Sequence, residues 1–138
     1  MSHWARMKFS FDIQPEHRAI YARYEGKFTL DDLLATTRQL WADPRYSPDY
    51  NGVVDISAGS VSVDINDLRT LAAFLVREPA TSSGRWAAVA TTPLAIACSL
   101  IYRSALRRRH GFEIFSTWEA ACGFLQLDPA TFPPDRPA

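Results

Sequence analysis

Residues 85–127 constrain the fold most, because strand and helix patterns alternate there twice. An apolar, β-rich run at residues 85–91 leads into an apolar helical segment that begins near Pro93. Gly111 precedes a second short strand at residues 112–115, and a last helical segment follows it. Strand, helix, strand, helix at this spacing is typical of a parallel sheet whose crossovers are helices.

The start of the chain has a different pattern. Residues 7–13 alternate between apolar and polar, which is the period of a strand with one face toward solvent. Residues 15–18 indicate a turn, and residues 19–24 predict a second strand that ends at Gly26. The short connection predicts an antiparallel hairpin.

Two further helices are marked by capping residues. Thr29 is the expected N-cap of a helix that Asp43 and Pro44 end, and Asp64, with Asp67 three residues later, is the expected N-cap of the next. The apolar stripe expected to be buried on that second helix is Ile65, Leu68, Leu71, Ala72, Leu75 and Val76.

A short strand at residues 53–56 is expected between these helices, followed by a loop at residues 57–62. Ser116 and Glu119 have the spacing of a capping box for the last helix. The resulting order is β-β-α-β-α-β-α-β-α. It predicts an α/β domain with a mixed sheet, in which an N-terminal antiparallel hairpin is followed by parallel strands.

Length and composition predict a single domain over residues 1–127 and a loose proline-rich tail over residues 128–138. Fifteen basic and fifteen acidic residues balance, so no net field favours nucleic acid or anionic membrane. No secretion signal and no apolar run long enough to cross a bilayer is present, so we expect a cytoplasmic protein.

Cys98 and Cys122 fall in predicted helical segments. They are either free buried thiols or partners in a disulfide, and free thiols are favoured.

This order of elements, with its residues, resembles the SpoIIAA-like superfamily, including the small bacterial STAS-type and STAS/Sec14-type domains. The residues that carry the resemblance are Tyr24-Glu-Gly26, Asp43-Pro-Arg-Tyr46, Val53-Val-Asp-Ile-Ser57, Phe112-Glu-Ile-Phe115 and Trp118-Glu-Ala-Ala121, with Phe124-Leu125. The resemblance extends from Phe9 to Leu127. It implies a (β/α) superhelical fold and a non-enzymatic regulatory or binding role.

One departure from that superfamily concerns phosphorylation. The anti-sigma-factor antagonists carry Asp-Ser-Ser-Gly with a phosphorylatable serine at the start of a helix. The corresponding stretch here is Asp64-Ile-Asn-Asp67, which has neither serine nor glycine. The resemblance therefore does not imply switching by phosphorylation at this position.

The expected loop at residues 57–62 is the first candidate site, for a ligand or a partner. It follows a strand of a parallel sheet and leads to a helix N-terminus, where such sheets commonly bind ligands. The candidate residues are Asp55, Ser57, Ser60, Ser62 and Asp64. The alternative interpretation, a plain connection closed by the Asp64 cap, is favoured.

A second candidate is a basic cluster, Arg103, Arg107 and Arg108, continued by Arg109 and His110. It suits a phosphate or an acidic partner. The alternative, which is favoured, is a solvated helix end whose positive charges complement the helix dipole.

Patterns for catalysis and metal binding are weak. His3, His17 and His110 lack partners at metal-ligand spacing, so neither a metal nor another cofactor is expected. Asp55 and Asp64 either form a pair of carboxylates at one site or belong to an acidic loop.

Tyr46 and Tyr50 lie in the turn-rich loop that follows the first predicted helix. They either line a groove or cover a helix end, and coverage is favoured.

Three functions remain open. The leading hypothesis is a non-enzymatic STAS-like module that acts through protein contact, including as a homodimer paired through its first strand. The alternative is a binding module for a small apolar or lipid-like ligand, suggested by the unusually apolar helix at residues 94–106, whose second face is free to line a cavity. The weakest is an enzyme that uses Asp55 and Asp64. Fold analogy supports the first two.

Overall fold

The computed structural model describes residues 7–81, 83–106 and 111–132. Its elements in chain order are β1 (Lys8–Gln14), a 3₁₀ turn η1 (Pro15–His17), β2 (Ala19–Thr29), α1 (Leu30–Ala42), β3 (Asn51–Ser62), α2 (Ile65–Arg77), β4 (Trp86–Val89), α3 (Pro93–Leu106), β5 (Phe112–Phe115), α4 (Trp118–Leu125) and a 3₁₀ turn η2 (Pro129–Thr131).

The five strands form one sheet in the order β1-β2-β3-β4-β5. β1 and β2 pair antiparallel, and every later neighbouring pair is parallel. Each parallel strand is reached through a helix, as parallel pairing requires. The predicted α/β class, with a hairpin first and parallel strands after it, is confirmed.

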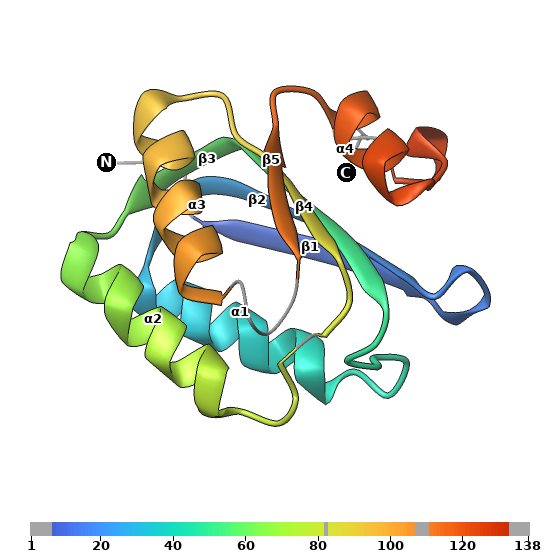
Figure 1. The fold of residues 1–138 in the computed structure, drawn as a ribbon, viewed down its shortest axis with the longest axis horizontal. Coiled ribbons are helices and arrows are strands. Elements are labelled where there is room, and N and C mark those ends of the chain that lie inside the picture. Colours follow the sequence, from blue (N-terminus) through green and yellow to red (C-terminus); the bar gives the residue numbers. More distant parts are fainter. Residues whose placement is uncertain (1–6, 82, 107–110, 133–138) are drawn as a thin grey trace.

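The helices cover the two faces of the sheet unequally. Helices α1, α2 and α3 lie against one face, and the short α4 lies against the other (Figure 1). Side chains alternate between these faces along each strand. Tyr21, Val53 and Ala87 pack with Trp118 and Cys122 under α4, whereas their neighbours in sequence point toward the three-helix side.

Two of the three expected helix starts are confirmed. Thr29 and Asp64 each accept a hydrogen bond from the backbone N–H three residues on, and Asp32 and Asp67 close the capping boxes. The start of α4 differs, because Thr117, and not Ser116, is its N-cap and accepts from Ala120 N.

Strands β2 and β3 are longer than predicted. Gly26 does not end β2; it lies within the strand with φ of 77°, just past a register shift between Arg23 and Glu25. The expected loop at residues 57–62 is wrong, because this segment continues β3 and pairs with the end of β2 from Ala58 to Ser62. The backbone groups of a strand as long as β2 need partners, and β3 supplies them.

The apolar stripe of α2 is narrower than predicted. Leu68, Leu71 and Leu75 are buried, whereas Ile65 is 49% and Val76 is 46% exposed. Both exposed residues lie at the ends of the helix, where less of the neighbouring structure covers the helix.

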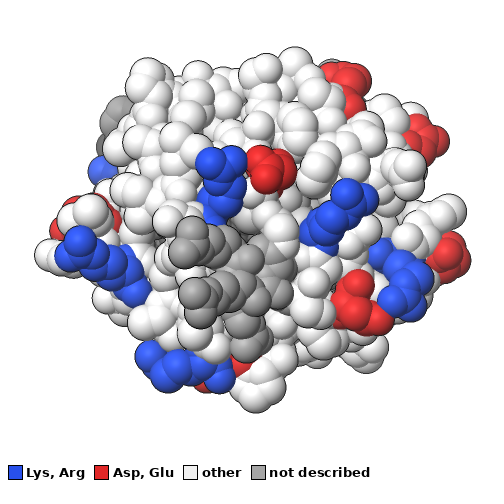
Figure 2. All heavy atoms as spheres, viewed as in Figure 1, with Lys and Arg blue, Asp and Glu red and all other residues white. Residues whose placement is uncertain are grey.

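Helix α3 points its small residues inward and its large ones outward. Ala95, Cys98 and Ser99 are buried, whereas Leu94, Ile96, Leu100 and Ile101 are exposed. Figure 2 shows a surface without charged side chains over the first half of α3. The outer face of this half of α3 is therefore exposed to solvent in the described chain. Within the residues that the structure describes, no helix has the length and apolar character needed to cross a membrane.

The segment after α4 packs against the domain. Asp128 caps the turn η2, and Phe132 is buried between Tyr21 and Trp118, with ring centroids 6.2 Å from each. The prediction of a loose tail is therefore wrong for residues 128–132, because an aromatic anchor outweighs the helix-breaking effect of the prolines. The remainder of the predicted tail lies outside the described residues.

Candidate ligand pocket

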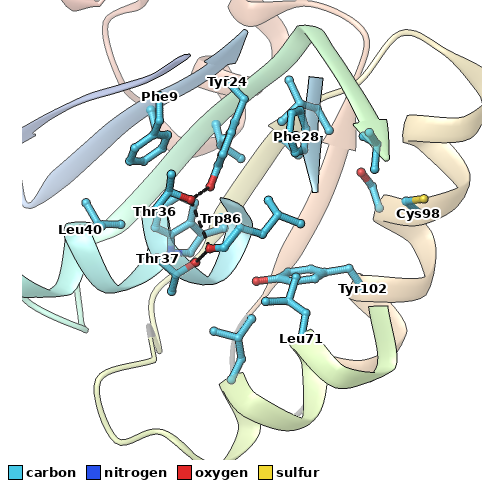
Figure 3. Close-up of a pocket in the computed structure, with 18 of the residues that line it drawn as sticks. Phe9, Tyr24, Phe28, Thr36, Thr37, Leu40, Leu71, Trp86, Cys98 and Tyr102 are labelled. Atoms are coloured by element: carbon cyan, nitrogen blue, oxygen red, sulfur yellow. Dashed lines mark hydrogen bonds between the residues drawn. The ribbon is translucent and has the colours of Figure 1, made fainter. Parts of the chain in front are cut away.

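A pocket of about 190 Å³ lies between the sheet and helices α1, α2 and α3 (Figure 3). All of its described lining residues are uncharged. They are Phe9, Ala22, Tyr24, Phe28, Leu33, Thr36, Thr37, Leu40, Trp41, Tyr46, Val54, Ile56, Val61, Val63, Leu68, Leu71, Leu75, Thr81, Trp86, Ala88, Ala95, Cys98, Ser99, Tyr102 and Phe112.

Two glycines of β3 let aromatic rings form parts of the wall. A β-carbon at Gly52 would come within 2.5 Å of the Trp86 ring, and one at Gly59 within 2.5 Å of Phe28. Both rings line the pocket. Each aromatic ring therefore occupies space beside a strand position that only glycine leaves open.

Helix α3 opens space above the sheet through its small inward residues. Ala95, Cys98 and Ser99 line the pocket from this helix, and Tyr102 follows them on the same face. Facing them, β4 contributes Ala88, which is 1% exposed. Small side chains on both the helix and the strand leave room that leucine or phenylalanine would fill.

The pocket contains a hydrogen-bonded pair, Tyr24 and Thr36. Their hydroxyl oxygens lie 2.5 Å apart, and Thr36 Oγ1 is 2.9 Å from the carbonyl oxygen of Asp32 and 3.2 Å from that of Leu33. Thr36 has a single hydroxyl proton, which it donates to these helix carbonyls. Tyr24 therefore donates to Thr36, and its proton is occupied.

Three further hydroxyls of the lining are also satisfied. Thr37 donates to the Leu33 carbonyl at 2.7 Å, Tyr46 to Ala80 O at 2.5 Å and Thr81 to Leu75 O at 2.5 Å. These bonds fix the side chains against the backbone around the pocket. They leave each donor without a proton for another partner.

Two hydroxyls are different. Neither Ser99 Oγ nor the Tyr102 hydroxyl has a hydrogen-bond partner among the residues that the structure describes, and neither oxygen is closed off from solvent. Ser99 is 6% exposed, and Figure 3 shows the Tyr102 ring reaching from α3 across the pocket with its hydroxyl end toward α1. Because the two lie three residues apart on one helix, they share a face.

Every ionisable group of the described lining is protonated at neutral pH, and burial raises its pKa further from neutrality. Loss of solvent raises the pKa of Tyr24 and of Tyr46 to about 12, and it raises the pKa of Tyr102 further, with help from the two other phenols nearby. Burial likewise raises the pKa of the Cys98 thiol. The pocket is therefore neutral, and its phenols are hydrogen-bond donors and not phenolates.

The residues of the first candidate site lie along β3 and at the start of α2, and not in a loop. Asp55 is 2% exposed, and its Oδ1 accepts from the backbone N–H and the hydroxyl of Ser57 at 2.8 and 2.6 Å. Ser60 and Ser62 lie exposed further along the same strand. Asp64 is the N-cap of α2.

Asp55 and Asp64 do not share a site. The strand between them continues to Ser62 and rises about 3.3 Å per residue, which separates the two carboxylates by roughly 20–30 Å. A pair of carboxylates at one site requires a loop at residues 57–62 that folds back, and this segment is extended. Asp55 accepts hydrogen bonds from Ser57 within β3, and Asp64 caps α2.

Of the predicted basic cluster, the structure describes Arg103. Arg103 forms an ion pair with Glu113 of β5 at 3.0 Å, with about half of each side chain exposed. Arg107 and Arg108 lie outside the described residues. Arg103 is thus already paired within the domain, and the prediction of an anion or partner patch stays a prediction.

Sequence reasoning missed most of the polar residues of this pocket. Tyr24, Thr36, Ser99 and Tyr102 were not selected, and Tyr46 was favoured as cover for a helix end, whereas it lines the pocket. One signal was present in the sequence. The apolar helix at residues 94–106 carries small residues on one face and large ones on the other, which indicates space on the small side.

Comparisons with known proteins agree with the fold. No protein-family model matches the chain, and no curated protein matches it. A solved structure of an uncharacterized DUF3478 family protein with a SpoIIAA-like fold, from Shewanella loihica, superposes with a TM-score of 0.59. The alignment covers 91% of this chain and 98% of that one, at 15% sequence identity. A five-stranded mixed sheet with interleaved helices and this superposition together identify the fold of the chain as SpoIIAA-like.

Proposed function

We propose that this protein is a binding module for a small, uncharged and largely apolar ligand. The observation that carries the proposal is the pocket of about 190 Å³ under α3, whose described lining is entirely uncharged. A concave, mostly apolar site with a few placed polar groups is the usual form of a small-molecule site.

The size of the pocket limits the ligand. An engineered cavity of about 150 Å³ with a leucine, isoleucine and phenylalanine lining binds benzene. A pocket slightly larger than that suits a substituted benzene or a bicyclic ring. A ligand of this size typically binds with a dissociation constant between about 10 µM and 1 mM.

The protonation states of the pocket's side chains favour a binding role over a catalytic one. Burial moves the pKa values of Tyr24, Tyr46, Tyr102 and Cys98 upward, away from neutrality, so none is prepared to act as a base or nucleophile at pH 7. This supports a non-enzymatic role.

The test is a pair of alanine-to-leucine substitutions on α3. Ala95 is 2% exposed and lines the pocket, whereas Ala97 is exposed on the outer face of the same helix. Ala95→Leu fills the pocket and should abolish binding of α-methylstyrene, while Ala97→Leu should leave it intact. Binding is measured by titration of the amide NMR spectrum. No saturable shift in the unaltered protein, or equal binding by both variants, would refute the proposal.

Protein contact is the second candidate, and the outer face of α3 supports it. Leu94, Leu100 and Ile101 are 56%, 43% and 38% exposed, and they lie on one side of the helix. Large apolar side chains grouped on a surface are typical of an interaction site. The edge position of β1 supports contact as well, since an edge strand presents unpaired backbone groups.

We propose self-association through α3 as the form of this contact. Light scattering should then give the mass of a dimer, and the double variant Leu100→Gln, Ile101→Gln should give that of a monomer. Ile65→Gln is the control, because Ile65 is 49% exposed on α2. A monomer at all concentrations for the unaltered protein would exclude this candidate and leave the ligand pocket unaffected.

A further inference from the structure

The ligand must satisfy the two hydroxyls of α3, an inference that rests on the proposed binding function. Ser99 and Tyr102 are the lining residues whose hydroxyl protons have no acceptor among the described residues. Both oxygens remain accessible from the pocket, where water can bond to them, so a ligand that displaces this water leaves the hydroxyls unpaired at a cost in free energy unless it accepts a hydrogen bond itself. A bound molecule that accepts a hydrogen bond removes this cost.

The Tyr102 hydroxyl is fixed in place. Its ring packs on Phe112, with centroids 4.9 Å apart and planes at 55°, and it also packs against the cluster of Leu71, Leu75 and Leu106. The rigid ring therefore holds the hydroxyl over the pocket (Figure 3). A fixed donor loses little conformational entropy when it receives a ligand.

The other polar groups of the pocket do not compete for the same role. Tyr24 donates to Thr36, Tyr46 to Ala80 O and Thr81 to Leu75 O. Their protons are committed to partners in the protein. Among the hydroxyl groups of the described lining, those without an acceptor in the protein are therefore on α3.

The charge of the lining excludes an anionic acceptor. No lysine, arginine or histidine is among the described lining residues, so a carboxylate or phosphate would lose its hydration without a counter-ion. A carbonyl oxygen is neutral and accepts through two lone pairs, which suits a hydroxyl donor in a lining without charge.

We infer that the ligand is an uncharged ring compound that bears a carbonyl group, and that the Tyr102 hydroxyl donates a hydrogen bond to this carbonyl. Ser99 supplies a second hydroxyl on the same face of α3. Tyr102 is thus the residue that distinguishes a ketone, ester or amide from a hydrocarbon of the same shape.

The test compares two probes of nearly identical shape, acetophenone and α-methylstyrene, in which a methylene group replaces the carbonyl oxygen. Dissociation constants for both are measured by NMR titration in the unaltered protein and in Tyr102→Phe. The loss of one hydrogen bond should weaken acetophenone binding roughly two- to tenfold. The affinity for α-methylstyrene should stay the same or increase. Because each probe is compared with itself, their different hydrophobicity cancels.

An infrared measurement gives a second readout that a merely structural role would not change. The carbonyl stretch of bound acetophenone should shift to lower frequency in the unaltered protein and return toward its value in apolar solvent in Tyr102→Phe. Tyr21→Phe is the control, because Tyr21 lies on the α4 face of the sheet. Tyr21→Phe should change neither the dissociation constant of either probe nor the carbonyl frequency of bound acetophenone.

The outcomes separate this inference from the proposed function. If both probes bind and Tyr102→Phe leaves their affinity ratio and the carbonyl frequency unchanged, the role of Tyr102 is wrong and the pocket remains a binding site. If neither probe binds to the unaltered protein, the proposed function itself fails.

Discussion

The indole of Trp86 lies directly over the α-carbon of Gly52, the residue opposite it in the parallel register of β3 and β4. A β-carbon at position 52 would approach three atoms of the ring to between 2.5 and 2.6 Å. No real side chain tolerates this distance. The glycine thereby determines where the ring lies, and the ring forms part of the pocket wall.

Replacement of Gly52 by alanine should displace Trp86 toward the pocket. We expect a loss of about 1–3 kcal/mol in the free energy of unfolding, the usual cost of an overpacked core. Urea denaturation followed by tryptophan fluorescence measures both the loss and the changed environment of the indole.

Gly123 provides the matched control for that substitution. It lies in α4, and a β-carbon there meets no atom within 4 Å. Gly123→Ala should therefore raise the free energy of unfolding by about 0.5–1 kcal/mol, since alanine favours helix. A loss of similar size in both variants would contradict the steric role of Gly52.

The N-cap of α4 can be tested against the position that the sequence suggests. Thr117 Oγ1 accepts from Ala120 N at 3.1 Å, so Thr117→Ala should cost about 1 kcal/mol of stability. Ser116→Ala should lower the free energy of unfolding much less. Thermal or urea unfolding of the two variants measures the difference, and a larger effect at position 116 would show that the cap lies there.

Phe132 is expected to anchor the end of the described chain. It is 7% exposed and contacts both Tyr21 and Trp118, while the Trp118 indole N–H donates to Pro129 O at 3.0 Å. Phe132→Ala should lower the free energy of unfolding by roughly 2–4 kcal/mol. Phe132→Leu, which keeps apolar volume, should cost less than about 1.5 kcal/mol. Equal, small effects in urea unfolding would mean that the segment does not support the core.

The sheet and its connections could be predicted because their signals are local. Alternation at residues 7–13 indicates the first strand, and capping boxes at Thr29 and Asp64 mark two helices. Each of these patterns depends on residues within one or two turns of each other. Such patterns can be recognised without knowledge of the tertiary structure.

The full length of β3 could not be predicted in the same way. Ser-Ala-Gly-Ser at residues 57–60 has the composition of a turn. It is held extended because Ala58 and the residues up to Ser62 pair with the end of β2, more than thirty residues earlier. A pairing of the Asp55 and Asp64 carboxylates fails for the same reason, because it requires the chain to turn back between them.

The pocket depends on distances between elements, which the sequence does not contain. The apolar faces of α1, α2 and α3 predict burial, and they predict equally well a solid core. Whether space remains is decided by how far Ala88 lies from Ala95 and Ser99 across the layer. The Tyr102 hydroxyl, which has no acceptor among the described residues, is likewise distinguished only once the hydrogen-bond partners of Tyr24, Tyr46 and Thr81 are known.

The contribution of the buried Tyr24 phenol to the free energy of unfolding should decrease at alkaline pH. Burial raises its pKa from 10.0 to about 12, so between these pH values the unfolded chain loses a proton that the folded chain keeps. The stability that the raised pKa contributes is complete below pH 10 and is lost as the pH rises toward 12. The difference in unfolding free energy between the unaltered protein and Tyr24→Phe should therefore shrink by about 1.4 kcal/mol per pH unit in this range. Urea unfolding at pH 8, 10 and 11.5 measures it, and a difference that stays constant would mean that Tyr24 ionises as readily as an exposed tyrosine.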